Sequence, residues 1–310
     1  IEAIKWAMEK LSKYADTEIG KKNLELLKSY FDSSAKTGTT IMNYAFVYIH
    51  YLFPYLAENN LPVEKLTEDD LSVIASDMDK KKFTSVHVFI RSILAFVNWV
   101  KGKKHMQTLT IRYVTIKRGE PQSAIIEDRM TDAHIRLILN NLKHDEDKLA
   151  VLLMAIYGLR ISEALGVRFS DFEFTENGSI LTVRYRAGDY GAKGLKAERK
   201  ISSAWLKKYG LVSPEYVSMF RELVSKLARK YGRDARLVHK SKRAVQKAIE
   251  VAGQRAEIPY RVHAHLFRHH FVANAIRHNV PHNELSIITG DRPETLDKYY
   301  SWLSPEMLLQ

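Results

Sequence analysis

The sequence predicts a mainly α-helical protein with a small antiparallel β-sheet in the second of two domains. Apolar residues recur at helical spacing through residues 1–115, without convincing strand alternation. Glycine, proline and many charges interrupt this period over 101–127. Beyond that segment, two runs of strand character, 178–186 and 197–203, flank a turn that contains glycine and lysine. The length of 310 residues also suits two domains of ordinary size.

The first domain, residues 1–117, is predicted to be a bundle of helices. Thr37 is placed to cap an aromatic-rich helix over 41–56. Thr67 is placed to cap a helix whose first turn is acidic, which suits the positive end of the helix dipole. An apolar helix over 86–100 closes the bundle. Nothing in this domain is diagnostic of a chemical activity.

The second domain, residues 118–310, opens with a helix that Thr131 is placed to cap. The apolar stretch 149–157 predicts a buried core helix, and the hairpin of the two strand-like runs follows it. The rest of the chain is again helical, with capping signals at Ser213 and Ser241. The second domain therefore combines helices with one β-hairpin.

The charge balance favours a polyanionic partner. A net charge of +12 and a pI near 9.5 point to nucleic acid first and to an anionic membrane surface second. The alternative is a basic protein that has no such partner. The chain has no cysteine, which excludes disulfides, thiolate zinc sites and cysteine nucleophiles. No run approaches the roughly 18 apolar residues of a membrane span, so we expect no membrane insertion.

Two expectations concern the location and completeness of the chain. A composition without cysteine fits a reducing compartment, and we expect the protein to act in the cytoplasm of its host cell. The chain opens at Ile1 rather than at a methionine. We interpret it as a fragment or a processed product that lacks an upstream region.

Two segments that lie far apart in the chain supply candidate phosphate ligands. Arg160 directly follows the predicted core helix, where its guanidinium can leave the core and hold a phosphate through two hydrogen bonds. The alternative is a structural arginine paired with Glu163 or Asp171. His265 and Arg268 share one face if their segment is helical, so that one can accept a proton while the other binds the same phosphate. The alternative is an amphipathic helix with partly buried polar residues.

Lysines and tyrosines near these segments are further candidates. Lys193 and Lys196 lie at the tip of the predicted hairpin, from which a lysine can reach a ligand. Lysine is equally typical of a solvated turn. Tyr299 and Tyr300 lie near the end of the chain, where they are either core aromatics or a source of a nucleophilic phenol.

The order of these features resembles the tyrosine recombinase and integrase family, which includes phage-type and Xer-type enzymes. Segment 158–165 resembles the first box of that family, and 265–269 resembles the second. Segment 290–300 aligns without a gap with the box that ends in the nucleophile. The resemblance covers roughly residues 125–305. Within the family, one interpretation is an integrase of an archaeal virus or plasmid.

The resemblance implies a role for each candidate residue. Arg160 and Arg268 would bind the non-bridging oxygens of a scissile phosphate and stabilise its transition state. Tyr300 would attack the phosphorus and form a 3′-phosphotyrosyl intermediate. His265 would act as the general base and Lys193 as the general acid. Because the phosphotyrosine keeps the bond energy, the resemblance implies no metal ion and no cofactor.

Some positions depart from the family pattern. A histidine or tryptophan that donates to the scissile phosphate usually follows the glycine of the third box, but this chain has Asp291 there. Either Arg292 takes over the donor role or the change marks reduced activity. The tandem tyrosines leave Tyr299 as an alternative nucleophile, and Lys196 is the alternative general acid.

The resemblance also implies a partner and an assembly. We expect a C-shaped clamp of two domains around double-stranded DNA, and a homotetramer that exchanges strands between two DNA segments through a Holliday junction. Free in solution, the chain would be a monomer. The expected function is that of a site-specific recombinase or integrase. The alternatives are an enzyme like a type IB topoisomerase, which rejoins the original strand, and a DNA-binding relative with impaired catalysis.

A basic stretch marks the expected DNA contacts outside the active site. Residues 226–247 contain nine lysines and arginines against one acid, which is more lopsided than an ordinary solvated helix face. We expect Lys240, Lys242, Arg243 and Lys247 to contact DNA phosphates, which position a protein on DNA without reading its sequence.

Overall fold

The structure is a computed structural model that describes residues 2–34, 36–80, 86–110, 130–176, 178–192, 197–294 and 296. The chain divides into two compact units, Ile1–Pro121 and Gln122–Gln310. The boundary predicted after residue 117 falls within 111–129, which lies outside the described residues.

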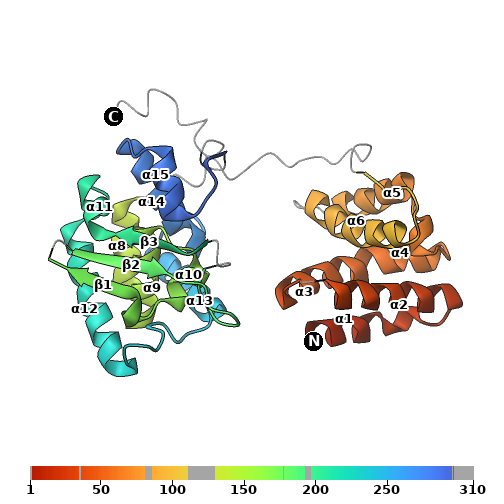
Figure 1. Ribbon diagram of the computed structural model, residues 1–310, viewed down its shortest axis with the longest axis horizontal. Coiled ribbons are helices and arrows are strands. Elements are labelled where there is room, and N and C mark those ends of the chain that lie inside the picture. Colours follow the sequence, from red (N-terminus) through yellow and green to blue (C-terminus); the bar gives the residue numbers. More distant parts are fainter. Residues whose placement is uncertain are drawn as a thin grey trace. The chain divides into compact units, whose positions relative to one another are not determined.

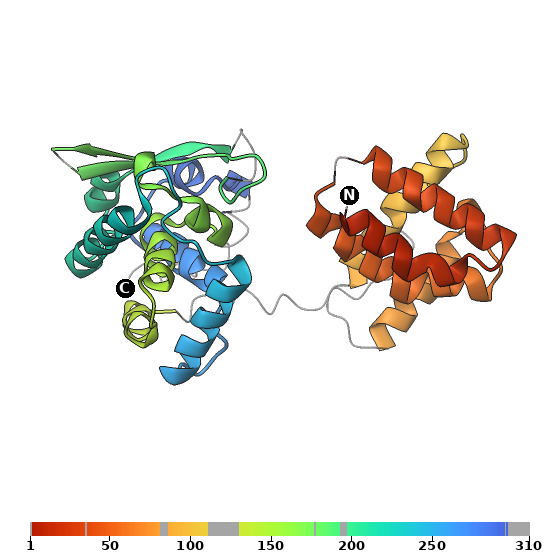
Figure 2. The same ribbon diagram turned by 90° about the horizontal axis from the view of Figure 1, so that it is seen from below.

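The first unit is built from helices, shown in red to orange in Figures 1 and 2. Thr37 and Thr67 accept hydrogen bonds from the backbone N–H groups of Thr40 and Asp70, as the predicted caps require. Its helices are α1 (Glu2–Leu11), α2 (Glu18–Ser33), α3 (Gly38–Val47), α4 (Phe53–Glu58), α5 (Glu68–Lys80) and α6 (Val86–Lys103), with short helical turns at Ser12–Tyr14 and Val63–Lys65.

The helix predicted over 41–56 is interrupted in the structure. A π-helical turn, Tyr48–Leu52, separates α3 from α4. Pro54 stands in the first turn of α4 and has no N–H group to donate to the preceding turn, which accounts for the change of hydrogen-bonding pattern at this point. Tyr48 is fully buried in this turn and donates its hydroxyl hydrogen to the carbonyl of Ser92 on α6, at 2.7 Å. The interruption therefore lies inside the core of the first unit.

The second unit consists of helices and one small sheet. Helix α9 (Asp145–Tyr157) begins with an acidic turn and then has every residue from Leu149 to Tyr157 buried, as predicted; it packs against α12 and α14. The other helices are α8 (Asp132–Asn141), α10 (Ile161–Gly166), α11 (Ser203–Lys208), α12 (Pro214–Tyr231), α13 (Lys242–Arg255), α14 (Ala264–Arg277) and α15 (His282–Thr289), with a 3₁₀ turn at Phe169–Asp171.

The sheet has three antiparallel strands in the order β1-β2-β3 and forms a layer over one side of the helices (Figure 2). The predicted hairpin is confirmed as β2 (Gly178–Val183) and β3 (Arg199–Ser202), paired with Leu181 opposite Ile201. Strand β1 (Phe172–Thr175) was not predicted. Only its first residue is buried, so its sequence has no alternation from which a strand can be inferred.

Candidate active site

Arg160 and Arg268 meet where α9 ends against α14. Gly158 ends α9 with a φ of 61°, and a Cβ atom there would lie 2.4 Å from the ring of Phe271 on α14. A glycine is therefore required for the turn that carries the chain to Arg160, the residue before α10. Arg268 is only 3% exposed and donates from Nη1 to the carbonyl of Gly158 at 2.5 Å. The turn thus brings the two arginines together.

The two guanidinium groups converge on one carboxylate. Arg160 Nη2 donates to Asp291 Oδ1 at 2.5 Å, and Arg268 Nη2 donates to Asp291 Oδ2. Both arginines also donate to the carbonyl of Thr289, at 3.5 Å and 2.9 Å. Two cations that share a single carboxylate form a site suited to an anion with two oxygens.

The buried ion pair of Glu163 and Arg199 supports this arrangement. Glu163 is 1% exposed and binds Arg199 of β3 through both oxygens, at 3.0 Å and 2.9 Å. Arg199 also donates from Nε to the carbonyl of Ile288 at 2.6 Å, which ties the end of α15 to the sheet. Burial favours the protonated form of Glu163, but hydrogen bonds and charge from Arg199 and Arg160 outweigh it and hold the Glu163 pKa below its usual value.

Arg160 also fulfils part of the alternative role, that of a structural arginine paired with an acid. Its Nη1 donates to Glu163 at 3.2 Å, and its backbone N–H donates to the same carboxylate at 2.8 Å. Asp171 instead pairs with Arg184 and Arg186, at 3.2 Å and 2.6 Å. Arg160 is therefore anchored on one side by Glu163, while its 32% exposed side chain still reaches Asp291.

The contribution of Arg199 to the site was not predicted from the sequence. A signal was present, because Arg199 and Ile201 are two residues apart in a strand and so point to the same face. Ile201 is buried in the core, which means that the face carrying Arg199 is buried too. An arginine on a core-facing strand position requires a buried acid as its partner.

His265 lies on α14 one turn before Arg268. Desolvation lowers its pKa, and the positive charges of Arg268 and Arg160 lower the pKa further. Its ring stands edge-on to that of His269, with ring centroids 4.2 Å apart. A lowered pKa keeps the His265 imidazole neutral near neutral pH, which is the form that can accept a proton.

The histidines of this helix predict a loss of stability in acid. Burial lowers the pKa of His269 to about 3, whereas an unfolded histidine has a pKa of 6.5. Below pH 6.5 the unfolded chain therefore binds a proton that the folded chain excludes, and the free energy of unfolding falls as the pH drops toward 3. The contribution of His269 is at most about 1.4 kcal/mol per pH unit. Urea unfolding between pH 7 and 5 measures this slope.

Substitution separates His269 from the rest of the protein in that experiment. His269→Asn is expected to make the pH dependence shallower. His105→Asn, which changes an exposed residue of the first unit, serves as the matched control and is expected to leave the slope unchanged. Equal slopes for all three proteins would contradict the assignment.

Several predicted site residues lie outside the described residues: Lys193, Lys196, Tyr299 and Tyr300. Their predicted roles as general acid and nucleophile stay predictions. Arg292 is described and exposed, and its neighbour Asp291 is the residue at the arginine pair. Donation by Arg292 to a phosphate also stays a prediction.

The four predicted DNA contacts differ in how their charges are used. Lys240 binds the buried carboxylate of Asp147 at 2.5 Å, which draws its ammonium into the protein. Lys247 lies 3.6 Å from Glu250 one turn further along α13. Lys242 and Arg243 are exposed in the first turn of α13, at the helix end that Ser241 caps. Of the four, these last two are the best placed to meet a phosphate.

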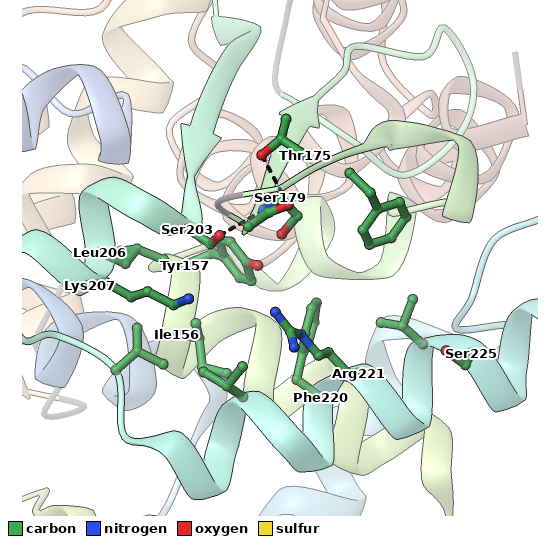
Figure 3. Close-up of a pocket in the computed structure, with 15 residues that line it drawn as sticks. Ile156, Tyr157, Thr175, Ser179, Ser203, Leu206, Lys207, Phe220, Arg221 and Ser225 are labelled. Carbon is green, nitrogen blue, oxygen red and sulfur yellow. Dashed lines mark hydrogen bonds between the residues drawn. The ribbon is translucent and has the colours of Figure 1, made fainter.

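A separate pocket lies away from the arginine pair. It has a volume of about 280 Å³ and lies between the sheet and α12 (Figure 3). Tyr157 and Phe220 line it, and Lys207 and Arg221 extend into it from α11 and α12. None of the predicted catalytic residues within the described ranges contributes to its wall.

Comparison with known proteins identifies the family. The sequence profile described as the Phage integrase family matches residues 128–301, more than half of the chain. The chain belongs to the phage integrase family. This match confirms the resemblance to tyrosine recombinases that the three boxes indicated. A search of curated protein sequences found no match.

Solved structures of lambda integrase, XerH recombinase and the Tn1549 transposon integrase share this fold. A lambda integrase (75–356) dimer bound to a COC′ core site has a TM-score of 0.62 at 12% identity, covering 89% of this chain and 94% of that chain. XerH recombinase bound to palindromic difH substrate has a TM-score of 0.61 at 12% identity, covering 98% and 92%. The Tn1549 transposon integrase bound to transposon right end DNA has a TM-score of 0.61 at 16% identity, covering 89% and 93%.

Among the described residues, no helix is both long and apolar enough to cross a membrane. The same residues contain no group of three or more histidine, cysteine, aspartate or glutamate side chains placed to hold a metal ion.

Proposed function

We propose that this member of the phage integrase family is a site-specific DNA recombinase that cleaves and rejoins strands through a covalent tyrosine intermediate. The observation that carries the proposal is the convergence of Arg160 and Arg268 on a single carboxylate. A phosphodiester also presents two oxygens and one negative charge, so the pair suits it equally well.

The chemistry follows from the charges around the phosphorus. Arg160 and Arg268 bind the two non-bridging oxygens and stabilise the charge that develops on them in the transition state. His265 accepts the phenolic proton as the Tyr300 oxygen bonds to phosphorus, and the bond from phosphorus to the 5′-oxygen breaks. Lys193 protonates the leaving oxygen, which gives a 3′-phosphotyrosine and a free 5′-hydroxyl. Religation reverses these transfers.

The proposed partner is double-stranded DNA. Lys242 and Arg243 supply phosphate contacts outside the active site. The assembly is a homotetramer on two DNA segments, which passes through a Holliday junction. The structural likeness to a lambda integrase tetramer bound to a Holliday junction, with a TM-score of 0.61 at 14% identity, supports the proposal at the level of the fold.

A second function is favoured by one observation. Asp291 already pairs with both arginines, which suits a DNA-binding relative that cleaves slowly or not at all. Covalent trapping distinguishes the two: a nicked suicide substrate run on a denaturing gel shows an adduct only if the reaction occurs. Binding in a mobility-shift assay without any adduct supports the second function. Relaxation of supercoiled plasmid regardless of its sequence supports a topoisomerase instead.

Substitution of the tandem tyrosines tests the nucleophile. Tyr300→Phe is expected to abolish the adduct, because it removes the only oxygen of the side chain and leaves the ring. Tyr299→Phe makes the same change one residue earlier and is expected to retain the adduct. Peptide mapping of the adduct identifies the attached residue directly. The opposite pattern would show that Tyr299 is the nucleophile.

A further inference from the structure

The Asp291 carboxylate accepts hydrogen bonds from the site in the way that a bound DNA phosphate would. Each of its oxygens accepts a hydrogen bond from a different arginine, Arg160 or Arg268. The non-bridging oxygens of a phosphodiester would accept from the same two side chains, and both groups carry one negative charge. The carboxylate and a DNA phosphate therefore compete for the same donors.

The backbone around Asp291 holds it in this position. Gly290 ends α15 with a φ of 66°, a conformation that turns the chain sharply toward the arginines. The N–H group of Asp291 donates to the Thr289 hydroxyl at 3.2 Å, and the Ser286 hydroxyl donates to the Asp291 carbonyl at 2.6 Å. With both of its own backbone groups bonded, residue 291 is an ordered part of the site.

Asp291 and its neighbours already engage several guanidinium donors of Arg160 and Arg268. Both hydrogens of Arg268 Nη2 are engaged, one by Asp291 and one by the carbonyl of Thr289. Arg160 Nη1 donates to Glu163 and to the same carbonyl. A phosphate that enters while the carboxylate stays would meet a like charge and few remaining donors. Asp291 is 21% exposed, so its side chain borders solvent and has room to leave.

We propose that Asp291 is an internal ligand that occupies the phosphate position of the free protein and that the scissile phosphate must displace. The proposal rests on the proposed function for the identity of the natural competitor. In the free protein the carboxylate compensates the charge of buried Arg268 and keeps both guanidinium groups convergent. Only the fraction of molecules in which the carboxylate has moved away can bind DNA phosphate at this site, which weakens the apparent affinity by that fraction.

Inorganic phosphate is the probe that tests this without DNA. Phosphate is expected to raise the melting temperature of Asp291→Asn by about 3 to 5 °C when present at ten times its dissociation constant. The wild type is expected to shift much less at the same phosphate concentration. Each shift is measured against the same variant in chloride at equal ionic strength, so a lower starting stability does not affect it. Asp291→Ser repeats the test with a smaller side chain.

Two control variants locate the effect. Asp291→Asn combined with Arg160→Ala is expected to lose the phosphate shift, because one of the two donors is gone. Asp69→Asn makes the same change of charge at an exposed position of the first unit and is expected to behave as wild type. Equal shifts of wild type and Asp291→Asn would overturn the proposal, as would no shift of either Asp291 variant or a shift that survives Arg160→Ala.

The result is independent of the proposed function. A phosphate shift specific to the Asp291 variants supports the internal ligand even if no covalent adduct with DNA ever forms. Conversely, adduct formation by a protein whose wild type and variants respond equally to phosphate supports the recombinase and overturns the internal ligand.

Discussion

Replacing Arg160 by alanine is expected to slow formation of the covalent protein–DNA adduct by about 100- to 1,000-fold, the usual cost of removing one transition-state donor. Arg160 contributes one of the two guanidinium groups that meet at Asp291. Its loss is expected to change the free energy of unfolding much less than the rate. Glu163 keeps its pairing with Arg199, and Asp291 keeps its pairing with Arg268. Single-turnover cleavage of a suicide substrate measures the rate.

Arg136→Ala is the matched control for that variant. Arg136 is an exposed arginine on α8 that pairs with Glu215 at 3.3 Å, so the same charge is removed away from the site. Its adduct rate is expected to stay within a factor of two or so of wild type, since exposed pairs contribute little. If the two variants cleave alike, Arg160 does not bind the scissile phosphate.

Replacing Arg199 by methionine is expected to lower the free energy of unfolding by about 3 to 5 kcal/mol, the cost of leaving a buried charge without its main partner. Glu163 is 1% exposed and Arg199 is 5% exposed, so water cannot replace the lost guanidinium. Methionine keeps much of the packed volume, which isolates the loss of charge from the loss of packing. Urea unfolding at pH 7 measures the difference.

Two further variants make the Arg199 prediction specific. Arg136→Met removes an exposed ion pair and is expected to cost less than about 1 kcal/mol. Glu163→Gln combined with Arg199→Met removes both buried charges and is expected to recover part of the stability lost in the single variant. A single variant as stable as wild type would show that the Glu163–Arg199 pair does not hold the end of α15 in place.

Local sequence signals predicted most of the helices. The caps at Thr37, Thr67 and Thr131 are present, because a side-chain oxygen one residue before a helix acts on the backbone within the same turn. The apolar run before Gly158 became the buried part of helix α9, since a helical stretch that is apolar on every side has no face to offer to water.

Signals that depend on distant contacts failed. Strand β1 has one buried residue in four and exists because β2 pairs with it, which no local pattern reveals. Within the predicted helix over 41–56, the pattern of apolar residues continues through the π-helical turn. That turn was missed for a different reason: Pro54 removes a backbone donor there, and the apolar periodicity does not register this loss.

In the candidate site, too, some features were predicted from the sequence and others depend on distant contacts. Arg160, His265 and Arg268 were predicted from their boxes, and the structure places Arg160 and Arg268 on one carboxylate. Asp291 was recognised in the sequence as an acid where a donor is usual. Its position between two cations is visible only in the structure. There, the acid that would repel a phosphate compensates the positive charges of Arg160 and Arg268.

By itself, the sequence predicted a mainly helical architecture in two domains, a resemblance to the family, and Arg160 and Arg268 as candidate site residues, because these follow from residue types and their order within short segments. Tertiary structure alone decided that Asp291 bridges those arginines and that Arg199 supports them through Glu163. Such pairings join residues from α10, β3, α14 and the end of α15. They depend on which turns the chain makes at Gly158 and Gly290, and a charge acquires its partner only once those turns have formed.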